Sequence, residues 1–246
     1  MSTQHSVVSA DEWLEARRAL LQREKDFTRL RDELNQARRD LPWEPVDKAY
    51  QFEGPDGTES LADLFAGRSQ LVVYHFMFDP AWDAGCPICS FWADNFNPII
   101  THLTHRDATM IAVSRAPYDK LARYQERMGW TFKWMSSAEC DFNADFHVSF
   151  TPDEVNGKSA FYNFTTQDPR RPEREGVSVF CKDAAGRVYH TYSAYARGID
   201  LLNTAYNYLD LLPMGRNEDG RGPNWVRRHD EYGDDASLHH LGRRNS

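Results

Sequence analysis

Apolar residues form two short, continuous runs in the first half of the chain. Residues 71–78 read LVVYHFMF, and residues 109–114 read TMIAVS. Runs of this length without polar alternation are typical of strands that are buried on both faces of a sheet. The intervening segment 90–100 has an aromatic face at helical spacing, and 118–128 reads as a second helix that Gly129 ends. The pattern therefore predicts the order strand, helix, strand, helix.

The second half of the chain predicts a hairpin and a last helix. Segments 177–181 and 188–193 are rich in β-branched and aromatic residues and flank a polar, glycine-containing turn. Residues 199–211 read as a helix that Pro213 ends. The aromatic residues of 136–175 stand among polar residues and prolines, and they predict an ordered loop region with some strand.

A long polar helix precedes these elements. Ser9 and Glu12 have the spacing of a capping box, and the helix is expected to continue to about Asp40. Apolar residues recur along it every seven positions, at Trp13, Leu20, Phe27, Leu34 and Leu41. The second stripe of the heptad is weak, which favours a helix laid along its own domain. Packing on a second copy of the chain, as in a homodimer, is the alternative.

Prolines and changes in composition divide the chain into three parts. Pro42 and Pro45 end the first helix. The predicted organisation is an N-terminal helical arm at 1–45, a domain at 46–215 and a C-terminal tail at 216–246, whose last residues are expected to be disordered.

Composition narrows the classes of function. A chain of 246 residues that is 41% hydrophobic suffices for one large domain with appendages. Its net charge of −8 disfavours a nucleic-acid partner. The longest apolar run is strand-sized and no secretory segment is seen, so we expect a cytoplasmic protein without membrane contact. Four cysteines in such a chain do not make a disulfide scaffold, which leaves redox or metal chemistry for a CxxC pair.

The candidate chemistry lies where the first core strand is followed by a helix. Cys86, Pro87 and Cys89 form a CxxC motif at this point. The dipole and free N–H groups of a helix N-terminus favour a thiolate, and the spacing brings the second sulfur within reach of the first. A CxxC at the first crossover, followed by a hairpin and a helix, is the order of the thioredoxin fold. The sequence thus predicts an α/β, thioredoxin-like three-layer sandwich with a mixed central sheet.

Six further segments carry a closer resemblance. They are residues 52–57, 71–78, 85–94, 128–130, 191–198 and 225–232. Over most of its length the chain resembles the thioredoxin-like domain-of-unknown-function 899 family, whose fold is related to that of thioredoxins and peroxiredoxins. The resemblance implies the fold and leaves the substrate undefined. It also marks Tyr195 and Arg197 as candidates for the pocket around Cys86, where the alternative for Arg197 is a structural contact with loop carbonyls.

The motif departs from that of thioredoxins in two places. Thioredoxins carry tryptophan directly before the first cysteine, whereas here Gly85 stands there and Trp82 lies further back. Thioredoxins also place a cis-proline before the third core strand, whereas here Glu175 and Gly176 lead into it. Docking of a substrate in the manner of thioredoxins is therefore not expected.

The comparison with peroxiredoxins gives a mixed result. The proline and threonine that precede their attacking cysteine correspond here to Asp79 and Asp83. A carboxylate at Asp83 is expected to raise the pKa of Cys86, which is unfavourable for a peroxidase. Arg174 stands roughly where peroxiredoxins keep an arginine that stabilises the thiolate.

Histidines offer two further hypotheses. His75, inside the first core strand, is expected to be a hydrogen-bonded core residue, with a proton acceptor for Cys89 as the alternative. His102 and His105 follow the two cysteines with nearly the spacing of a zinc finger. The spacing is one residue short, and a straight helix would carry these histidines roughly 20 Å away. We expect no metal and no cofactor.

These observations together predict a thiol–disulfide oxidoreductase. Cys86 would attack a disulfide of a protein or of a small thiol compound, Cys89 would resolve the intermediate, and an external thiol reductant would restore the pair. Two alternatives remain: a peroxiredoxin-like peroxidase, and a non-catalytic thioredoxin-fold binding or sensor protein.

Overall fold

The computed structural model describes residues 5–218 and 220–233 of the chain. Contacts divide the chain into two compact units, Met1–Pro42 and Trp43–Ser246. The predicted disorder at the end of the tail concerns residues 233–246, of which 234–246 lie outside the described residues. No helix among the described residues is both long and apolar enough to cross a membrane.

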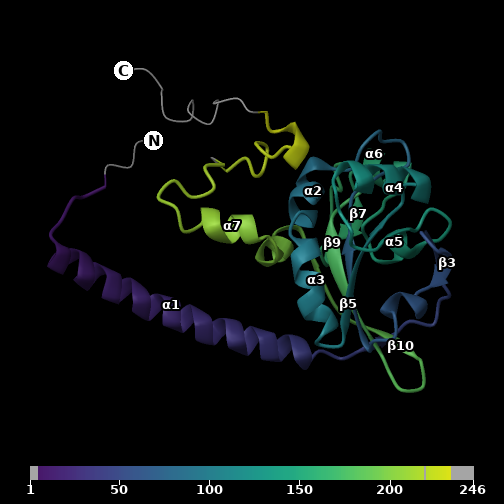
Figure 1. The fold of residues 1–246 in the computed structure, drawn as a ribbon, viewed down its shortest axis with the longest axis horizontal. Coiled ribbons are helices and arrows are strands. Elements are labelled where there is room, and N and C mark those ends of the chain that lie inside the picture. The colour runs from purple at the N-terminus through teal and green to yellow at the C-terminus, as the bar shows by residue number, and fades with distance from the viewer. Residues whose placement is uncertain (1–4, 219, 234–246) are drawn as a thin grey trace. The chain divides into compact units, whose positions relative to one another are not determined.

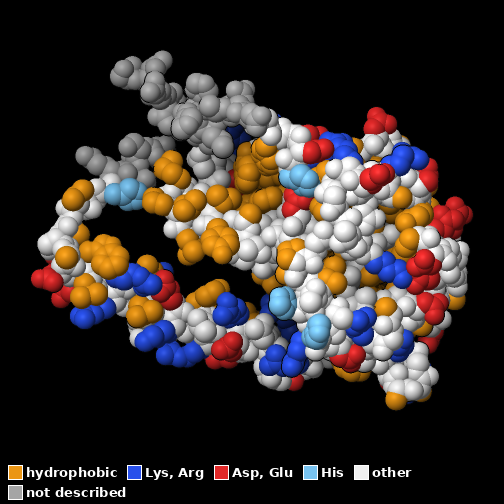
Figure 2. Space-filling view, viewed as in Figure 1, with side chains coloured by type: hydrophobic (Ala, Val, Ile, Leu, Met, Phe, Trp, Pro, Cys, Tyr) orange, Lys and Arg blue, Asp and Glu red, His pale blue; other side chains and the backbone are white. Residues whose placement is uncertain are grey.

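The first unit is a single helix, α1 (Ala10–Arg39). Ser9 is its N-cap, and the predicted capping box with Glu12 is confirmed by hydrogen bonds in both directions. No residue of α1 is buried. The heptad side chains are consequently exposed, Trp13 by 59% and Phe27 by 64%, and Figure 2 shows apolar groups interspersed with charged ones along this helix.

The second unit is built on an eight-stranded mixed sheet with the order β1-β10-β9-β4-β5-β6-β2-β3. Its strands are β1 (Glu44–Pro45), β2 (Gln51–Gly54), β3 (Gly57–Ser60), β4 (Gln70–His75), β5 (Ala108–Ser114), β6 (Trp134–Ser136), β9 (Gly176–Lys182) and β10 (Val188–Tyr195). Strands β4, β5 and β6 are parallel, whereas β9 is antiparallel to both β4 and β10. Strands β7 (Ala160–Tyr162) and β8 (Thr165–Gln167) form a separate ribbon.

Short helices and 3₁₀ turns lie between these strands or follow the last of them. They are η1 (Asp63–Phe65), α2 (Pro87–Ala93), α3 (Phe96–Thr104), α4 (Tyr118–Arg127), α5 (Phe142–Asp145), α6 (Pro152–Asn156), η2 (Ala196–Leu202), α7 (Thr204–Leu209) and η3 (His229–Glu231). In Figure 1, α2 and α3 run one after the other across the sheet.

Two apolar clusters divide the side chains of the sheet. Because neighbouring residues of a strand point to opposite faces, Tyr74 joins a cluster with α2, α3 and α4, whereas Leu71 and Val73 join one with η1 and α5. Helical elements thus cover both faces. The chain order β4, α2, α3, β5, α4, β9, β10 and the neighbour order β5-β4-β9-β10 are those of the thioredoxin fold, so the predicted fold class is confirmed.

Element boundaries differ from the prediction in three places. The helix expected at 90–100 is interrupted, because the Asn95 side chain donates hydrogen bonds to the carbonyls of Phe91 and Trp92 and ends α2. The helix expected at 199–211 is divided into η2 and α7, with the Asn203 side chain as the N-cap of α7. Strand β1 pairs with β10, so the sheet already begins at Glu44.

Candidate functional site

The first cysteine is fixed between a loop and a helix. Cys86 is the N-cap of α2, and Pro87 lies in its first turn. Proline is suited to this position because a backbone N–H there would have no partner within the helix. The Cys86 N–H donates to the Met77 carbonyl at 3.1 Å. Its own carbonyl accepts from the N–H and the hydroxyl of Ser90 at 3.0 and 2.9 Å. The backbone on both sides of the thiol is therefore held in place.

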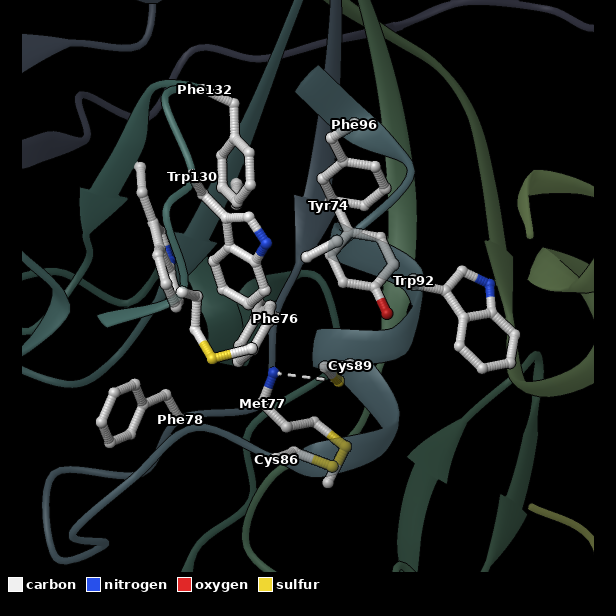
Figure 3. Close-up of a cluster of buried hydrophobic side chains, with 14 of the residues drawn as sticks. Tyr74, Phe76, Met77, Phe78, Cys86, Cys89, Trp92, Phe96, Trp130 and Phe132 are labelled. Carbon is white, nitrogen blue, oxygen red and sulfur yellow. Dashed lines mark hydrogen bonds between the residues drawn. The ribbon is translucent and has the colours of Figure 1, made fainter. Parts of the chain in front are cut away.

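The second cysteine lies one turn deeper. The Cys89 side chain is fully buried, and its sulfur accepts a hydrogen bond from the Met77 N–H at 3.4 Å (Figure 3). Cys86 is itself only 6% exposed. Access to Cys86 is through a cavity rather than from the open surface.

The two thiols have pKa values that move in opposite directions. The hydrogen bond from the Cys89 thiol has the largest influence on the pKa of Cys86, which it lowers. Burial raises this pKa, whereas the N–H groups of Cys89 and Ile88 and the charge of Arg171 lower it further. The net effect lowers the pKa of Cys86 to about 7. Burial, together with the adjacent Cys86, raises the pKa of Cys89 well above its ordinary value. Cys86 is thus the thiol of the pair that ionises first as the pH rises.

The sequence-based expectation that Asp83 raises this pKa finds no support. The groups that act most strongly on the Cys86 thiol are Cys89, the two backbone N–H groups and Arg171. Asp83 is exposed, so water screens its carboxylate. Arg171, which the sequence analysis did not single out, supplies the nearby charge instead.

We expect alkylation of Cys86 by iodoacetamide to rise with pH through a midpoint near 7. A free thiol would give a midpoint of about 8.5. Because the thiolate is the reactive form, the rate at pH 6 should be roughly tenfold below its plateau. Mass-mapped labelling between pH 5 and 9 measures this, with Asp83→Asn as a control that keeps the midpoint. First labelling at Cys89, or a midpoint at 8.5, would contradict the assignment.

Tyr74, rather than His75, is the polar side chain of β4 that faces the buried thiol. Strand β4 directs Tyr74 toward Cys89 (Figure 3), and the charge and hydrogen bonding of Cys89 contribute to the raised pKa of this tyrosine after burial itself. His75 points to the opposite face, where its Nε2 contacts the Ser178 hydroxyl at 2.8 Å and its ring stacks on Phe146. Burial lowers the pKa of His75 to about 3, and it has no contact with the thiols.

Glycine precedes Cys86 because two rings occupy the space of a side chain. A Cβ atom on Gly85 would lie 2.7 Å from the Phe76 ring and 2.8 Å from the Tyr124 ring. The carbonyl of Gly85 accepts from Arg228 at 2.7 Å, and Arg228 also donates to the Tyr124 hydroxyl at 2.8 Å. This hydroxyl is 2.9 Å from that of Ser90, which binds the Cys86 carbonyl.

The C-terminal segment is thereby part of the support of the motif. Further ion pairs fasten it to the domain: Arg127 binds Asp230 and Glu231, and the His229 ring contacts Asp94 at 2.7 Å. Residues 225–232 are among the segments that carry the family resemblance, which implies no role for them. Their contacts show that they hold the loop before Cys86 from outside.

A cavity of about 680 Å³ contains Cys86 in its wall. Tyr74, Met77 and Trp92 line it on the side of the sheet and helix. Arginines line much of the remainder, at positions 170, 171, 174, 197 and 216.

The predicted site residues divide between the cavity and its surroundings. Arg174 and Arg197 lie in the wall of the cavity with Cys86. Trp82 packs against the apolar cluster beside the motif, and its carbonyl accepts from Lys120. Tyr195 packs its ring over Gly176 and donates to the Phe146 carbonyl at 3.1 Å, in a different cluster.

The remaining metal-ligand residue types lie apart. No group of three or more histidine, cysteine or acidic side chains suited to a metal ion occurs among the described residues. His102 and His105 are exposed near the end of α3. Cys140 and Cys181 are half-buried thiols outside the cavity.

Fold and site together define a thioredoxin-fold protein with a buried CxxC pair at the start of a helix. The chain belongs to the family described as bacterial protein of unknown function (DUF899), whose model matches residues 2–232. No curated protein is significantly similar to it in sequence.

Similar solved structures are distant in sequence. Peroxidoxin BcpB from Mycobacterium tuberculosis is 16% identical, with a TM-score of 0.45, over 67% of this chain and 94% of that one. Peroxiredoxin Q from Xanthomonas campestris is 12% identical, with a TM-score of 0.47, over 70% of this chain and 98% of that one. The assignment of the fold rests on the strand order described above.

Proposed function

We propose that the protein is a thiol–disulfide oxidoreductase that uses Cys86 and Cys89 as its redox pair. The observation that carries the proposal is the opposite direction of the two pKa shifts within one hydrogen-bonded pair. A thiolate beside a protonated thiol is the arrangement that dithiol exchange requires, because the first attacks and the second resolves.

The chemistry proceeds in two exchanges. The Cys86 thiolate attacks one sulfur of a disulfide, forms a mixed disulfide and releases the other sulfur as a thiolate, which takes a proton from solvent. The Cys89 thiol then loses its proton and attacks the Cys86 sulfur. The second thiolate of the substrate leaves and takes up that proton. Two external thiols of the cytoplasm, a reducing compartment, or one external dithiol, then reduce the pair to the dithiol state and are themselves oxidised to a disulfide.

Tyr74 is proposed as a positioning residue for the second step. Its hydroxyl is buried and faces Cys89, and it forms no hydrogen bond with any other described residue. An O–H beside this sulfur is able to donate to the Cys89 thiolate as it forms, which lowers the cost of a buried charge. His75, the alternative proton acceptor for Cys89, contacts Ser178 on the opposite face of the sheet and takes no part in this step.

The stoichiometry of exchange tests the proposal. Reduced protein mixed with a small chromogenic disulfide should release two thiolates for each protein molecule through Cys86 and Cys89, leaving a bond between them. The same protein should react with hydrogen peroxide far more slowly, and this difference distinguishes a thiol–disulfide oxidoreductase from a peroxidase. A protein that forms no bond between Cys86 and Cys89 under either oxidant would instead be a binding protein.

A further inference from the structure

We propose that the cavity selects small anionic disulfides, compounds that carry carboxylates near the disulfide bond, and that Arg170 and Arg171 recognise these carboxylates. The inference deepens the proposed function and rests on it. The chain has a net charge of −8, whereas the wall of the cavity carries five arginines against four carboxylates, at positions 175, 200, 210 and 218.

Several charged groups of the cavity wall are already paired with neighbouring groups. Arg216 binds Asp200 and Asp210 at 2.8 Å each and lies over the Tyr206 ring. Glu218 accepts from the Tyr206 hydroxyl and the Trp225 indole. These groups are engaged with one another and are not available for a ligand.

Two other arginines are partly engaged. Arg174 lies over the Tyr162 ring at 4.2 Å and is 3.6 Å from Glu175. Arg197 is 3.4 Å from Asp200 but 89% exposed, so this pairing is weak.

Arg170 and Arg171 remain as free cations of the wall. Neither side chain forms an ion pair within the part of the chain that the structure describes. Arg171 is close enough to lower the pKa of the Cys86 thiol by its charge. A carboxylate bound to it would therefore be held near the attacking sulfur, and guanidinium groups suit carboxylates because they donate paired hydrogen bonds.

The loop that carries these arginines is anchored. The Phe150 N–H donates to the Pro172 carbonyl at 2.9 Å, and the Arg174 N–H donates to the Val148 carbonyl at 2.8 Å. Between them, the buried Glu173 side chain accepts from the Ser149 hydroxyl at 2.7 Å and pairs with Arg115 at 3.2 Å. The cations are consequently presented from a fixed backbone.

Size and burial favour a small molecule over a folded protein. The Cys86 thiol lies in the wall of a cavity and is 6% exposed. To reach Cys86, a disulfide on the surface of a folded protein would have to enter the cavity together with the backbone that surrounds it. A cavity of about 680 Å³ is in the range of sites for small ligands.

The test compares three disulfides of different charge with the reduced, full-length protein. Oxidised glutathione is anionic, bis(2-hydroxyethyl) disulfide is neutral and cystamine is cationic. We expect the second-order rate constants, each corrected for the intrinsic reactivity of the disulfide with a free thiol, to fall in that order. In Arg171→Gln the ratio of anionic to neutral rate should fall about fivefold, the factor that one unit charge produces at close range in water-like surroundings.

The ratio of the anionic to the neutral rate constant does not depend on the effect of Arg171 on the pKa of the Cys86 thiol. Any change in the Cys86 pKa alters both rates together, whereas recognition of a carboxylate alters only one. Arg170→Gln should lower the same ratio, and Arg123→Gln, an exposed arginine of α4 outside the cavity, should leave it unchanged. Equal ratios in wild type and both cavity variants would refute the anionic preference while leaving the exchange reaction intact. Failure of all three disulfides to react would refute the proposed function instead.

Discussion

Replacing Cys89 with serine is expected to leave the protein joined to its substrate by a mixed disulfide. In Cys89→Ser the Cys86 thiolate still attacks, but no thiol remains to resolve the mixed disulfide. Thiolate release should fall from two per protein to one, and a covalent adduct on Cys86 should accumulate. Cys86→Ser should release none. Chromogenic release and intact-mass measurement record both outcomes.

Cys181→Ser is the matched control for this pair of variants. Cys181 is a half-buried thiol outside the cavity, so its replacement should leave the release of two thiolates unchanged. An adduct on Cys181 in Cys86→Ser, or full release by Cys89→Ser, would show that the reactive pair has been misassigned.

Loss of Trp134 is expected to have the largest effect on stability. The side chain is 1% exposed, packs against Phe76 at 4.5 Å between ring centroids, and donates to the Ser114 hydroxyl at 3.0 Å. Trp134→Ala should lower the free energy of unfolding by about 3–5 kcal/mol. Since small domains have only about 5–15 kcal/mol in total, the variant should be largely unstable at 37 °C.

Urea denaturation followed by far-ultraviolet circular dichroism measures this loss. Trp13→Ala removes the same side chain from α1, where it is 59% exposed, and should change stability by less than about 0.5 kcal/mol. A similar loss in both variants would mean that the core under the CxxC loop does not hold the domain together.

The fold could be predicted because its strongest patterns are local. The continuous apolar runs gave β4 and β5, the polar turn between two β-rich segments gave the β9–β10 hairpin, and the CxxC marked the crossover. Segment 136–175 had no consistent period, so its short helices α5 and α6 and the β7–β8 ribbon were not assigned.

The site was less predictable for two physical reasons. A strand that is apolar throughout does not show which of its side chains meets a given neighbour, so the choice between Tyr74 and His75 depended on the register of β4 in the sheet. The contacts of Arg228 with Gly85 and Tyr124 join parts of the chain separated by more than 100 positions, and no periodicity predicts them. The same holds for Arg171, which stands in a loop.

The central claim, that Cys86 and Cys89 are a reversible redox pair, is tested most directly by a redox titration. The protein is equilibrated in buffers of reduced and oxidised glutathione, whose ratio sets the potential over the range of interest, quenched by alkylation and mapped by peptide mass. We predict a disulfide between Cys86 and Cys89 that forms and breaks reversibly with a midpoint between about −270 and −180 mV, the interval from thioredoxin to protein disulfide isomerase. A pair that stays reduced throughout, or a bond that includes Cys140 or Cys181, would contradict the account.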